Sequence, residues 1–568
     1  MPKSKARNIP ILVLILLLAF GLRVFYLTED RFHADEALYA GWALRLLDGD
    51  PLLLGVPVDK PPLFLYTLAG AFTLFGPSEL AGRWISLACS MVSIALIYRL
   101  ARASLSSSTG RQTAGTATSS RPALWATFFF ALSPFNILFA RTAFTDAMLV
   151  MWIVAALCAT VQGHRFRAGT LTGLAFATKQ HAVVLIPLIV AVQGWSSLQP
   201  RHDTRPVFSN AQNDEKHIRS RGFSRVLNHS AHRLKPRLQN WHWNFALSML
   251  GSALGFLIPW GIVTWWDSAR WQIRPGYWDQ SALSYGGLVW APAGEWGPRF
   301  VEWLGWARYL AGSTTTSVAF VIGVVILLIW SWRRRLRTRE TWLDTLWAAA
   351  ILAYLVFHSV LAFSIWDRYL LPLGVPVALL SARIVTSLDC ALGRMAQRLR
   401  HATSPPYSEA GEKAQRIRPA VSGTYRVLNI ARGGVPYLVA GVVLAFGIRA
   451  ATNAYPIGGE HWAYQGVDEV TDYLKENAAS NAVLYHHWLR WHYTFYLYGT
   501  DFELRWWQDG AHLRQEARKS PDREQYIVLP TWRPLDPSID GVRFVPLLET
   551  RRRDGSTSLI LCRVELDP

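Results

Sequence analysis

Apolar runs long enough to cross a lipid bilayer recur along this chain, and they restrict its fold more than any other feature of the sequence. The first run covers residues 9–27, is interrupted only by Arg23, and follows Lys3, Lys5 and Arg7. No water is present inside a bilayer to bond the backbone, so apolar runs of this length cross it as helices, which satisfy their own hydrogen bonds. The sequence therefore predicts an α-helical polytopic membrane protein with about 10 to 13 membrane segments.

The composition fits a protein that lies partly in the membrane. Of the 568 residues, 51% are hydrophobic and 17% are charged. That is too apolar for an ordinary soluble protein of this charge content and too polar for a chain embedded in lipid throughout. Many of the basic residues behind the net charge of +19 lie in gaps between apolar runs, within residues 219–237, 333–339 and 394–432. Cytoplasmic loops facing anionic lipid explain this pattern better than nucleic acid does. We therefore expect no nucleic-acid partner, and we expect residues 196–241 and 391–434 to be cytoplasmic.

The character of the chain changes near its C-terminus. VDEVTDYLKENA has helical spacing, whereas NAVLYHH and QYIVLP have the composition of short strands. We predict a membrane domain over residues 1–453 and a small extracytoplasmic α/β domain over residues 454–568, about one hundred residues long. The four cysteines, at positions 89, 158, 390 and 562, are far apart, so their spacing indicates neither a disulfide framework nor a metal site.

The loop between the first two apolar runs, residues 28–62, concentrates polar side chains at the membrane surface. The basic residues before the first run place this loop outside the cytoplasm. Asp35 and Glu36 open a helical pattern whose apolar residues share one face, as in a helix lying on a membrane: Leu38, Trp42, Leu46 and Leu47. The acidic pair either caps this helix or places two carboxylates near the lipid headgroups. Asp59 and Lys60 follow where the chain re-enters the membrane.

A family resemblance is carried by DEALYAGWALRLLDGD, then GVPVDKPPLFLYTLAGAFTLFGPSELAGRW, and later by SPFNILFARTAFTDAML, GLAFATKQHAVVLIPL and WDRYLLPLGVPVALL. In this order, over most of residues 9–382, the fragments resemble the polyprenyl-phosphate-sugar-dependent glycosyltransferases of the GT-C fold. That family includes the lipid A aminoarabinose transferase and the protein O-mannosyltransferases. The resemblance implies a membrane enzyme that moves a sugar from a polyprenyl-phosphate donor to a lipid, glycan or protein acceptor on the extracytoplasmic side, with inversion. It implies no dissociable cofactor and leaves the need for a divalent metal open.

Such a transfer needs a base for the acceptor proton. Asp35 is the candidate base, because a carboxylate near cations and partly removed from water can be tuned toward the working pH, and Glu36 is the second choice. Asp146 matches the family's second acidic position and could orient the acceptor or assist the base. It could equally cap the apolar helix that begins at residue 147.

The leaving phosphate needs cations. Lys60 is the foremost candidate, because two prolines fix the backbone after it, although a lysine at the end of a span also commonly snorkels to the headgroups. The other candidate phosphate ligands are Arg141, Lys179 and Arg368, and Arg368 could instead anchor the start of a span. Possible supporting residues are Asp59, Arg83 and Tyr369. His33 and His358 are isolated histidines and are expected to be structural.

The order of the apolar runs raises a problem of topology. If every run within residues 63–140 crossed fully, Asp146 would lie inside, whereas the resemblance places it outside. We therefore expect residues 122–140, which contain Ser133 and Pro134, to form a broken or re-entrant segment. Residues 169–194 carry Lys179 at their middle and are expected to form two half-helices that meet at an external tip.

The competing class of protein is a transporter or a lipid-binding membrane protein without transferase activity. Buried ionisable residues among many spans would also be expected there. Against this class stand the absence of an inverted sequence repeat and the acidic external loop.

Overall fold

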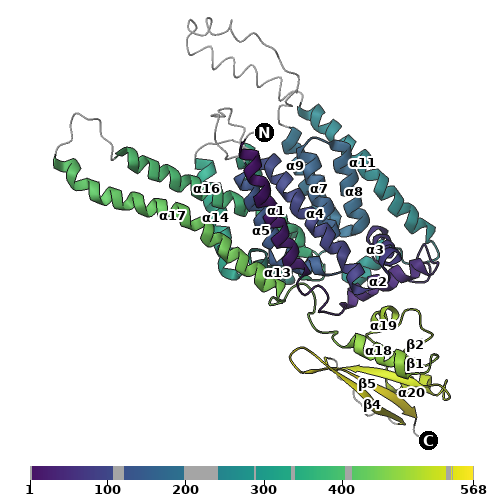
Figure 1. The fold of residues 1–568 in the computed structure, drawn as a ribbon. Helices are drawn as coiled ribbons and strands as arrows, with labels where there is room; N and C mark the ends of the chain where they lie inside the picture. The colour runs from purple at the N-terminus through teal and green to yellow at the C-terminus, as the bar shows by residue number, and fades with distance from the viewer. Residues whose placement is uncertain are drawn as a thin grey trace.

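The computed structural model describes residues 3–105, 120–197, 241–286, 289–333, 339–402, 412–532, 539 and 541–566. These residues form a bundle of helices with a smaller α/β domain attached to one end (Figure 1). The helix α1 (Lys3–Val24) begins at the opposite end of the bundle and runs toward the domain.

The bundle has the helices that a polytopic membrane protein needs. Seven described helices are long and apolar enough to cross a membrane: α4 (Glu79–Leu105), η3 with α9 (Gln180–Leu185 and Ile186–Ser197), α11 (Trp241–Ala269), α14 (Thr314–Arg333), α15 (Arg339–Val360), η7 with α16 (Asp367–Leu373 and Gly374–Ala402), and α17 (Glu412–Ala451). One bent pair and three shorter apolar helices add to them. The prediction of a polytopic helical fold is confirmed.

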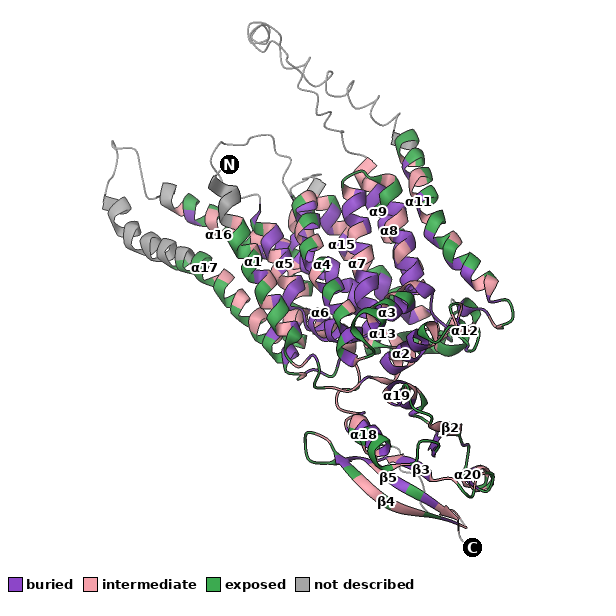
Figure 2. Ribbon diagram, turned by 45° about the vertical axis from the view of Figure 1, so that its right-hand side comes forward, coloured by how far each residue is buried: buried purple, intermediate pink, exposed green. Residues whose placement is uncertain are grey.

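Burial divides the bundle into a core and a periphery. Figure 2 shows the buried residues concentrated in α4, α7 (Asp146–Val161) and α8 (Arg165–Thr178). The outer helices expose large apolar side chains, such as Leu254 on α11, Val321 on α14 and Leu438 on α17. Side chains of this kind are stable on an outer surface when that surface faces lipid.

The segment after residue 120 is broken but crosses the bundle. It comprises α5 (Arg121–Leu132), α6 (Pro134–Leu138) and η2 (Phe139–Arg141), and it bends by 60° at Ser133. It runs beside α1 over its whole length. Asn8 bonds to Ser120 near one end, and Arg141 donates to the Phe25 carbonyl over 2.9 Å at the other. The expected break is therefore present, and the segment extends from one end of α1 to the other.

The segment that does not cross is α3 (Pro62–Phe75), which the sequence analysis counted as a span. Its 14 residues extend over roughly 21 Å. It lies beside α2 (Ala34–Leu47) at the end of the bundle that carries the α/β domain (Figure 1). Because α3 stays at that end, α4, α5–η2 and α7 cross in turn, and Asp146 starts α7 at the same end as the first loop. This correction resolves the topology problem.

The structure also describes residues 169–194 and much of residues 391–434. Residues 169–194 do form two half-helices, with α8 ending at Thr178 and η3 beginning at Gln180, so that Lys179 lies at the break in extended conformation. Within residues 391–434, which are expected to be cytoplasmic, α16 continues to Ala402 and α17 begins at Glu412. The basic stretch 198–240, the linker 106–119 and residues 334–338 and 403–411 lie outside the described residues.

The segment between α11 and α14 contains short helices at the domain end of the bundle: α12 (Tyr277–Tyr285), η5 (Ala293–Glu295), α13 (Trp296–Ala307) and η6 (Arg308–Ala311). Beside them lies α2, whose residues Ala37, Tyr39 and Leu44 are buried in the core. The polar residues of the first loop lie against these elements.

The C-terminal part folds as a five-stranded sheet of order β2-β1-β3-β5-β4. Its strands are β1 (Val483–His486), β2 (Glu503–Trp506), β3 (Gln525–Pro530), β4 (Val542–Arg551) and β5 (Thr557–Leu566). Strand β1 pairs parallel with β2 and β3, whereas β5 pairs antiparallel with β3 and β4. Helices α18 (Val467–Asn477) and α19 (Arg490–Tyr496) share one hydrophobic core with the sheet, and α20 (Gly510–Ala517) shares another. The helix and the two strands predicted from sequence correspond to α18, β1 and β3.

Candidate active site

Three ion pairs lie together at the domain end of the bundle. The atoms joined are Nη1 of Arg368 and Oδ2 of Asp35 (2.5 Å), Nζ of Lys60 and Oδ1 of Asp59 (2.8 Å), and Nζ of Lys179 and Oδ1 of Asp146 (2.7 Å). The residues come from α2, the segment before α3, the start of α7, the break before η3, and η7. Five of the predicted site residues, with the predicted supporting residue Asp59, are therefore brought together in space.

Asp35 is the member of this cluster that the sequence named as base. The α2 helix is capped by His33, whose Nδ1 accepts the Asp35 backbone N–H over 3.1 Å, so the carboxylate of Asp35 is not needed as a cap. Burial alone would raise the pKa of Asp35, but the charges of Arg368 and His33 hold it well below its usual range. In this state Asp35 is a weak base, contrary to the expectation that its surroundings tune it toward the working pH.

Glu36 points to a different set of partners. Its Oε2 accepts the His33 N–H over 2.8 Å, its Oε1 accepts the Ala143 N–H over 2.6 Å, and Arg83 donates to it over 3.3 Å. Arg83 also donates to the carbonyls of the first loop. The structure thus uses Glu36 to fasten the first loop to the segment before α7, and it gives Arg83 a supporting position.

The two lysines are buried between acids and aromatic rings. The Nζ of Lys60 lies 4.1 Å from the centroid of the Tyr285 ring, and that of Lys179 lies 4.6 Å from the centroid of the Tyr369 ring. Burial lowers the pKa of both lysines, that of Lys179 to about 8, while the neighbouring carboxylates oppose the shift. Aromatic faces and acids thus surround both lysine side chains in place of water.

A pocket of about 640 Å³ opens beside these lysines. Its polar wall is formed by Lys60, Lys179, Gln180, His181, Ser281, Tyr285 and Tyr369. Its apolar wall is formed by Val183, Val184, Trp278, Ala282 and Phe363. No Asp or Glu lines it, so among the described residues the wall carries two ammonium groups and no carboxylate. Such a pocket suits a ligand with an anionic group and an apolar part.

Arg141 does not take part in this pocket. Its two terminal nitrogens donate to the carbonyls of Phe25, Ala450 and Ala451 and to the side chain of Asn453. Arg141 therefore ties together the ends of α1 and α17. The structure corrects the prediction that Arg141 binds the donor phosphate, because four of its N–H groups already have protein acceptors.

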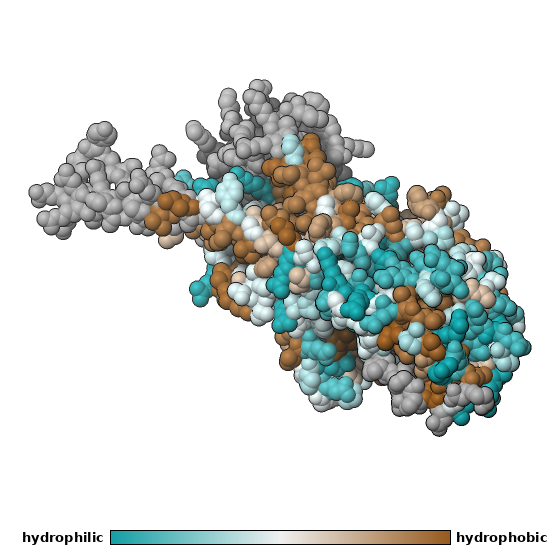
Figure 3. All heavy atoms as spheres, turned by 60° about the horizontal axis from the view of Figure 1, so that its bottom comes forward, coloured by the Kyte–Doolittle hydropathy of each residue, from teal (hydrophilic) through white to brown (hydrophobic). Residues whose placement is uncertain are grey.

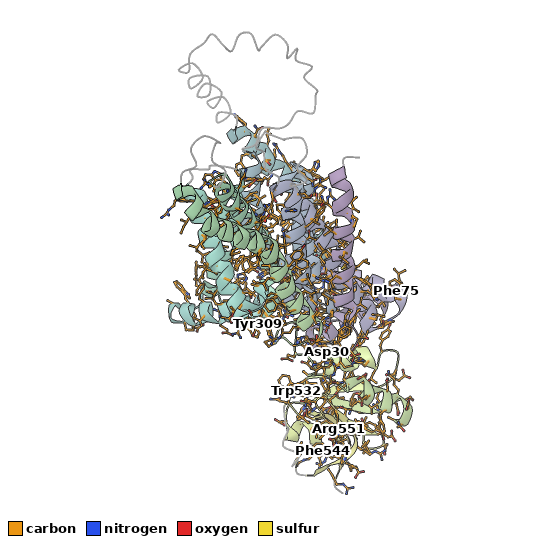
Figure 4. All side chains as sticks on the ribbon, turned by 60° about the vertical axis from the view of Figure 1, so that its left-hand side comes forward. Asp30, Phe75, Tyr309, Trp532, Phe544 and Arg551 are labelled. Carbon is orange, nitrogen blue, oxygen red and sulfur yellow. The ribbon has the colours of Figure 1, made fainter. Side chains whose placement is uncertain are left out.

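Sequence reasoning missed the contribution of the C-terminal domain. The N–H of Phe32 donates to Glu79 over 3.1 Å and to the Tyr496 hydroxyl over 3.2 Å, and the carbonyl of Phe32 accepts from His492 over 2.9 Å. Tyr496 and His492 belong to α19, which packs on α2. Asp30 lies at the same junction (Figure 4) and accepts from His461 over 3.0 Å. No local sequence pattern predicts that this domain bonds to Phe32, the residue before the α2 cap His33.

Two further wall residues were also missed as candidates. Tyr285 is the last residue of α12 and was not among the predicted site residues. His181 follows Lys179 by two residues, and its nearness to that candidate was the available signal. His358 was expected to be structural, and its Nδ1 lies 2.8 Å from the carbonyl of Tyr354. Within the described residues, no group of three or more His, Cys, Asp or Glu is arranged to hold a metal ion.

Comparison with known proteins agrees with this picture. Residues 59–203 match the family described as dolichyl-phosphate-mannose-protein mannosyltransferase. Two solved structures of ArnT from Cupriavidus metallidurans are similar over nearly the whole chain. The structure bound to undecaprenyl phosphate is 13% identical, with a TM-score of 0.53, and covers 98% of each chain. The apo structure is 12% identical, with a TM-score of 0.54, and covers 99% of this chain and 98% of the other. No curated protein sequence matches the chain significantly.

These findings define the fold. The chain is a multi-pass membrane protein with the fold of the solved ArnT structures, as the sequence analysis predicted. At 12 to 13% identity the likeness to ArnT shows the fold alone.

Proposed function

We propose that the protein transfers a sugar from a polyprenyl-phosphate donor to an acceptor hydroxyl on the extracytoplasmic side, with inversion at the anomeric carbon. The observation that carries this proposal is the pocket with Lys60 and Lys179 on a wall that also bears apolar side chains, next to Asp35. A phosphate suits the ammonium groups and a polyprenyl chain suits the apolar wall. The solved ArnT bound to undecaprenyl phosphate, which shares this fold, supports the same donor class.

The ion pairs of the site suggest how the donor would activate the base. Arg368 and the two lysines now neutralise carboxylates. An arriving phosphate competes for the same cations, and a cation that turns toward the phosphate weakens its hold on its carboxylate. When Arg368 does so, Asp35 loses the charge that depresses its pKa and becomes a stronger base. Donor binding would thus prepare Asp35 for proton transfer.

The transfer step then follows with one displacement. Asp35 takes the proton of the acceptor hydroxyl, and the acceptor oxygen forms a bond to the anomeric carbon from the face opposite the phosphate. The bond between that carbon and the phosphate oxygen breaks, and the electron pair leaves on the polyprenyl phosphate, which Lys60, Lys179 and Arg368 neutralise. A single attack of this kind inverts the anomeric carbon. Asp146, held by Lys179, would orient the acceptor or assist Asp35.

The orientation in the membrane is proposed from the distribution of charge. The basic residues at positions 3, 5 and 7 begin α1 at the end opposite the α/β domain. The positive-inside rule places that end in the cytoplasm and the site outside. The view from the domain end shows mainly hydrophilic atoms with scattered apolar patches (Figure 3), as expected of a surface in water.

A transfer assay tests the proposal. Purified protein is incubated with a panel of radiolabelled undecaprenyl-phosphate sugars and an extract of cell-envelope acceptors, with Asp35→Asn as the matched inactive variant. Label should leave the lipid with wild-type protein alone. Binding of the lipid without release of label from any donor would instead favour a lipid-binding protein or transporter. Single-cysteine labelling in intact cells tests orientation, and an externally labelled cysteine near residue 219 would contradict it.

A further inference from the structure

One residue of the pocket wall, His181, has hydrogen bonds that fix where its proton lies. Its ring stacks on that of Tyr369, with centroids 4.8 Å apart and an interplanar angle of 12°. Its Nε2 lies 2.8 Å from the Tyr354 hydroxyl and 3.1 Å from Nε2 of His358. The side chain is otherwise enclosed, since the residue is 8% exposed.

His358 determines the arrangement. Its Nδ1 lies 2.8 Å from the Tyr354 carbonyl, which can only accept, so this nitrogen carries a proton. In a neutral imidazole Nε2 of His358 is then an acceptor, and the contact with His181 requires a proton on Nε2 of His181. The Tyr354 hydroxyl donates to the Tyr369 carbonyl over 2.5 Å, so its oxygen can accept from the same His181 N–H. We assign the tautomers from this network.

Both histidines are best satisfied as neutral rings. A protonated ring of His181 or His358 would place a positive charge inside the bundle. It would lie near the ammonium of Lys179, which interacts electrostatically with His181. The neutral arrangement satisfies the hydrogen bonds of both rings with Tyr354 and with each other. His181 therefore has its proton on Nε2 and a free electron pair on Nδ1.

This electron pair faces the pocket. Among the described residues none bonds to Nδ1 of His181, and the atom is not sealed from solvent. The pocket that His181 lines gives access to it. The wall thus offers a bound ligand a hydrogen-bond acceptor two residues from the Lys179 ammonium.

The chemistry of the proposed donor decides which of its parts can use this acceptor. A polyprenyl chain has no hydrogen-bond donor, and the phosphodiester of a lipid-linked sugar is an anion without a proton at neutral pH. The hydroxyl groups of the sugar are the donors that remain.

We infer that one hydroxyl group of the donor sugar donates a hydrogen bond to Nδ1 of His181. The inference rests on the proposed function and names a residue that recognises the sugar. His181 is then a specificity-determining residue: it recognises the sugar, while Lys60 and Lys179 hold the phosphate.

The experiment separates sugar from phosphate. Wild type and His181→Phe are compared in affinity for undecaprenyl phosphate without sugar, and in KM and kcat for undecaprenyl phosphate linked to mannose, glucose, galactose, arabinose or 4-amino-4-deoxyarabinose. His181→Phe should raise the KM for the sugar-linked donor that wild type transfers best about tenfold, the worth of one hydrogen bond, and leave the affinity for undecaprenyl phosphate within about twofold.

Two matched variants guard against a merely structural effect. His181→Asn places an acceptor near the position of Nδ1, and His181→Gln places one near the position of Nε2. Asn should therefore restore donor use and Gln should not. Equal weakening of undecaprenyl phosphate and sugar-linked donor in His181→Phe would overturn the inference. Failure of wild-type protein to bind undecaprenyl phosphate would overturn the proposed function itself, and the inference with it.

Discussion

Replacing Asp35 with Asn should abolish sugar transfer while leaving the protein folded. The substitution keeps the volume of the side chain and an oxygen that can still accept from Arg368. The cap of α2 is unaffected, because His33 provides it. What is lost is the negative charge beside Arg368 and the capacity to take a proton.

The structure sets the size of both effects. The Asp35 side chain retains 21% of its exposure, so the loss of its charge against Arg368 should cost less than the ~3–5 kcal/mol typical of a fully buried pair, about 1–2 kcal/mol. Loss of a general base lowers the rate by roughly a hundredfold to ten-thousandfold. Activity should therefore fall far more than stability.

Glu36→Gln is the matched control, and its effects should be reversed. The Glu36 carboxylate accepts from the backbone N–H groups of His33 and Ala143 and from two nitrogens of Arg83. A Gln amide would turn its NH₂ group toward donors and lose about two of these bonds. At ~1.5–3 kcal/mol for each bond to a charged acceptor, the loss of stability is about 3–6 kcal/mol. The fraction that stays folded should keep at least a tenth of its transfer rate.

Turnover of radiolabelled donor and thermal unfolding in detergent, measured on both variants and wild type, give the answer. An Asp35→Asn protein with near-normal turnover would show that another group takes the proton. A stable but inactive Glu36→Gln protein would show that Glu36 is the base and that Asp35 has the structural role.

Three further outcomes are expected. Lys60→Ala should raise the KM for donor by roughly 10- to 100-fold through the loss of a charge-assisted contact, and it should lower the unfolding temperature because the buried Asp59 loses its partner. Lys60→Arg should retain more activity; equal donor affinity in wild type and Lys60→Ala would remove Lys60 from the phosphate site. Because burial, opposed by Asp146, lowers the pKa of Lys179 to about 8, this lysine is charged below that pH, so kcat/KM should fall as the pH rises through about 8, and the fall should move to higher pH in Lys179→Arg. Tyr496→Phe removes a bond to the Phe32 N–H, so kcat should drop with donor KM unchanged; an unaltered kcat would show that the C-terminal domain does not position Asp35.

The sequence by itself determined the class of fold. Runs of apolar residues separated by basic gaps require crossing helices, because an unpaired backbone is too costly in lipid. Ser133 and Pro134 predicted the break between α5 and α6, and the local periodicity of residues 467–477 predicted α18. Asp35 and Lys60 could be named because each stands in a short contiguous pattern at the membrane surface.

The tertiary structure decided which charges meet. Asp35 and Arg368 are 333 positions apart in the chain, yet they form one ion pair that lowers the pKa of the carboxyl group. Arg141 was, like Arg368, a candidate cation for the donor phosphate. Its guanidinium instead donates to carbonyls at the ends of α1 and α17. Local sequence patterns also could not predict that α3 stays at the domain end of the bundle. Nor could they predict that Tyr496 and His492 of the C-terminal domain bond to Phe32. A pattern of residues reports neighbours along the chain, whereas the protonation of a carboxylate and the partner of a guanidinium depend on distances through space, which packing alone sets.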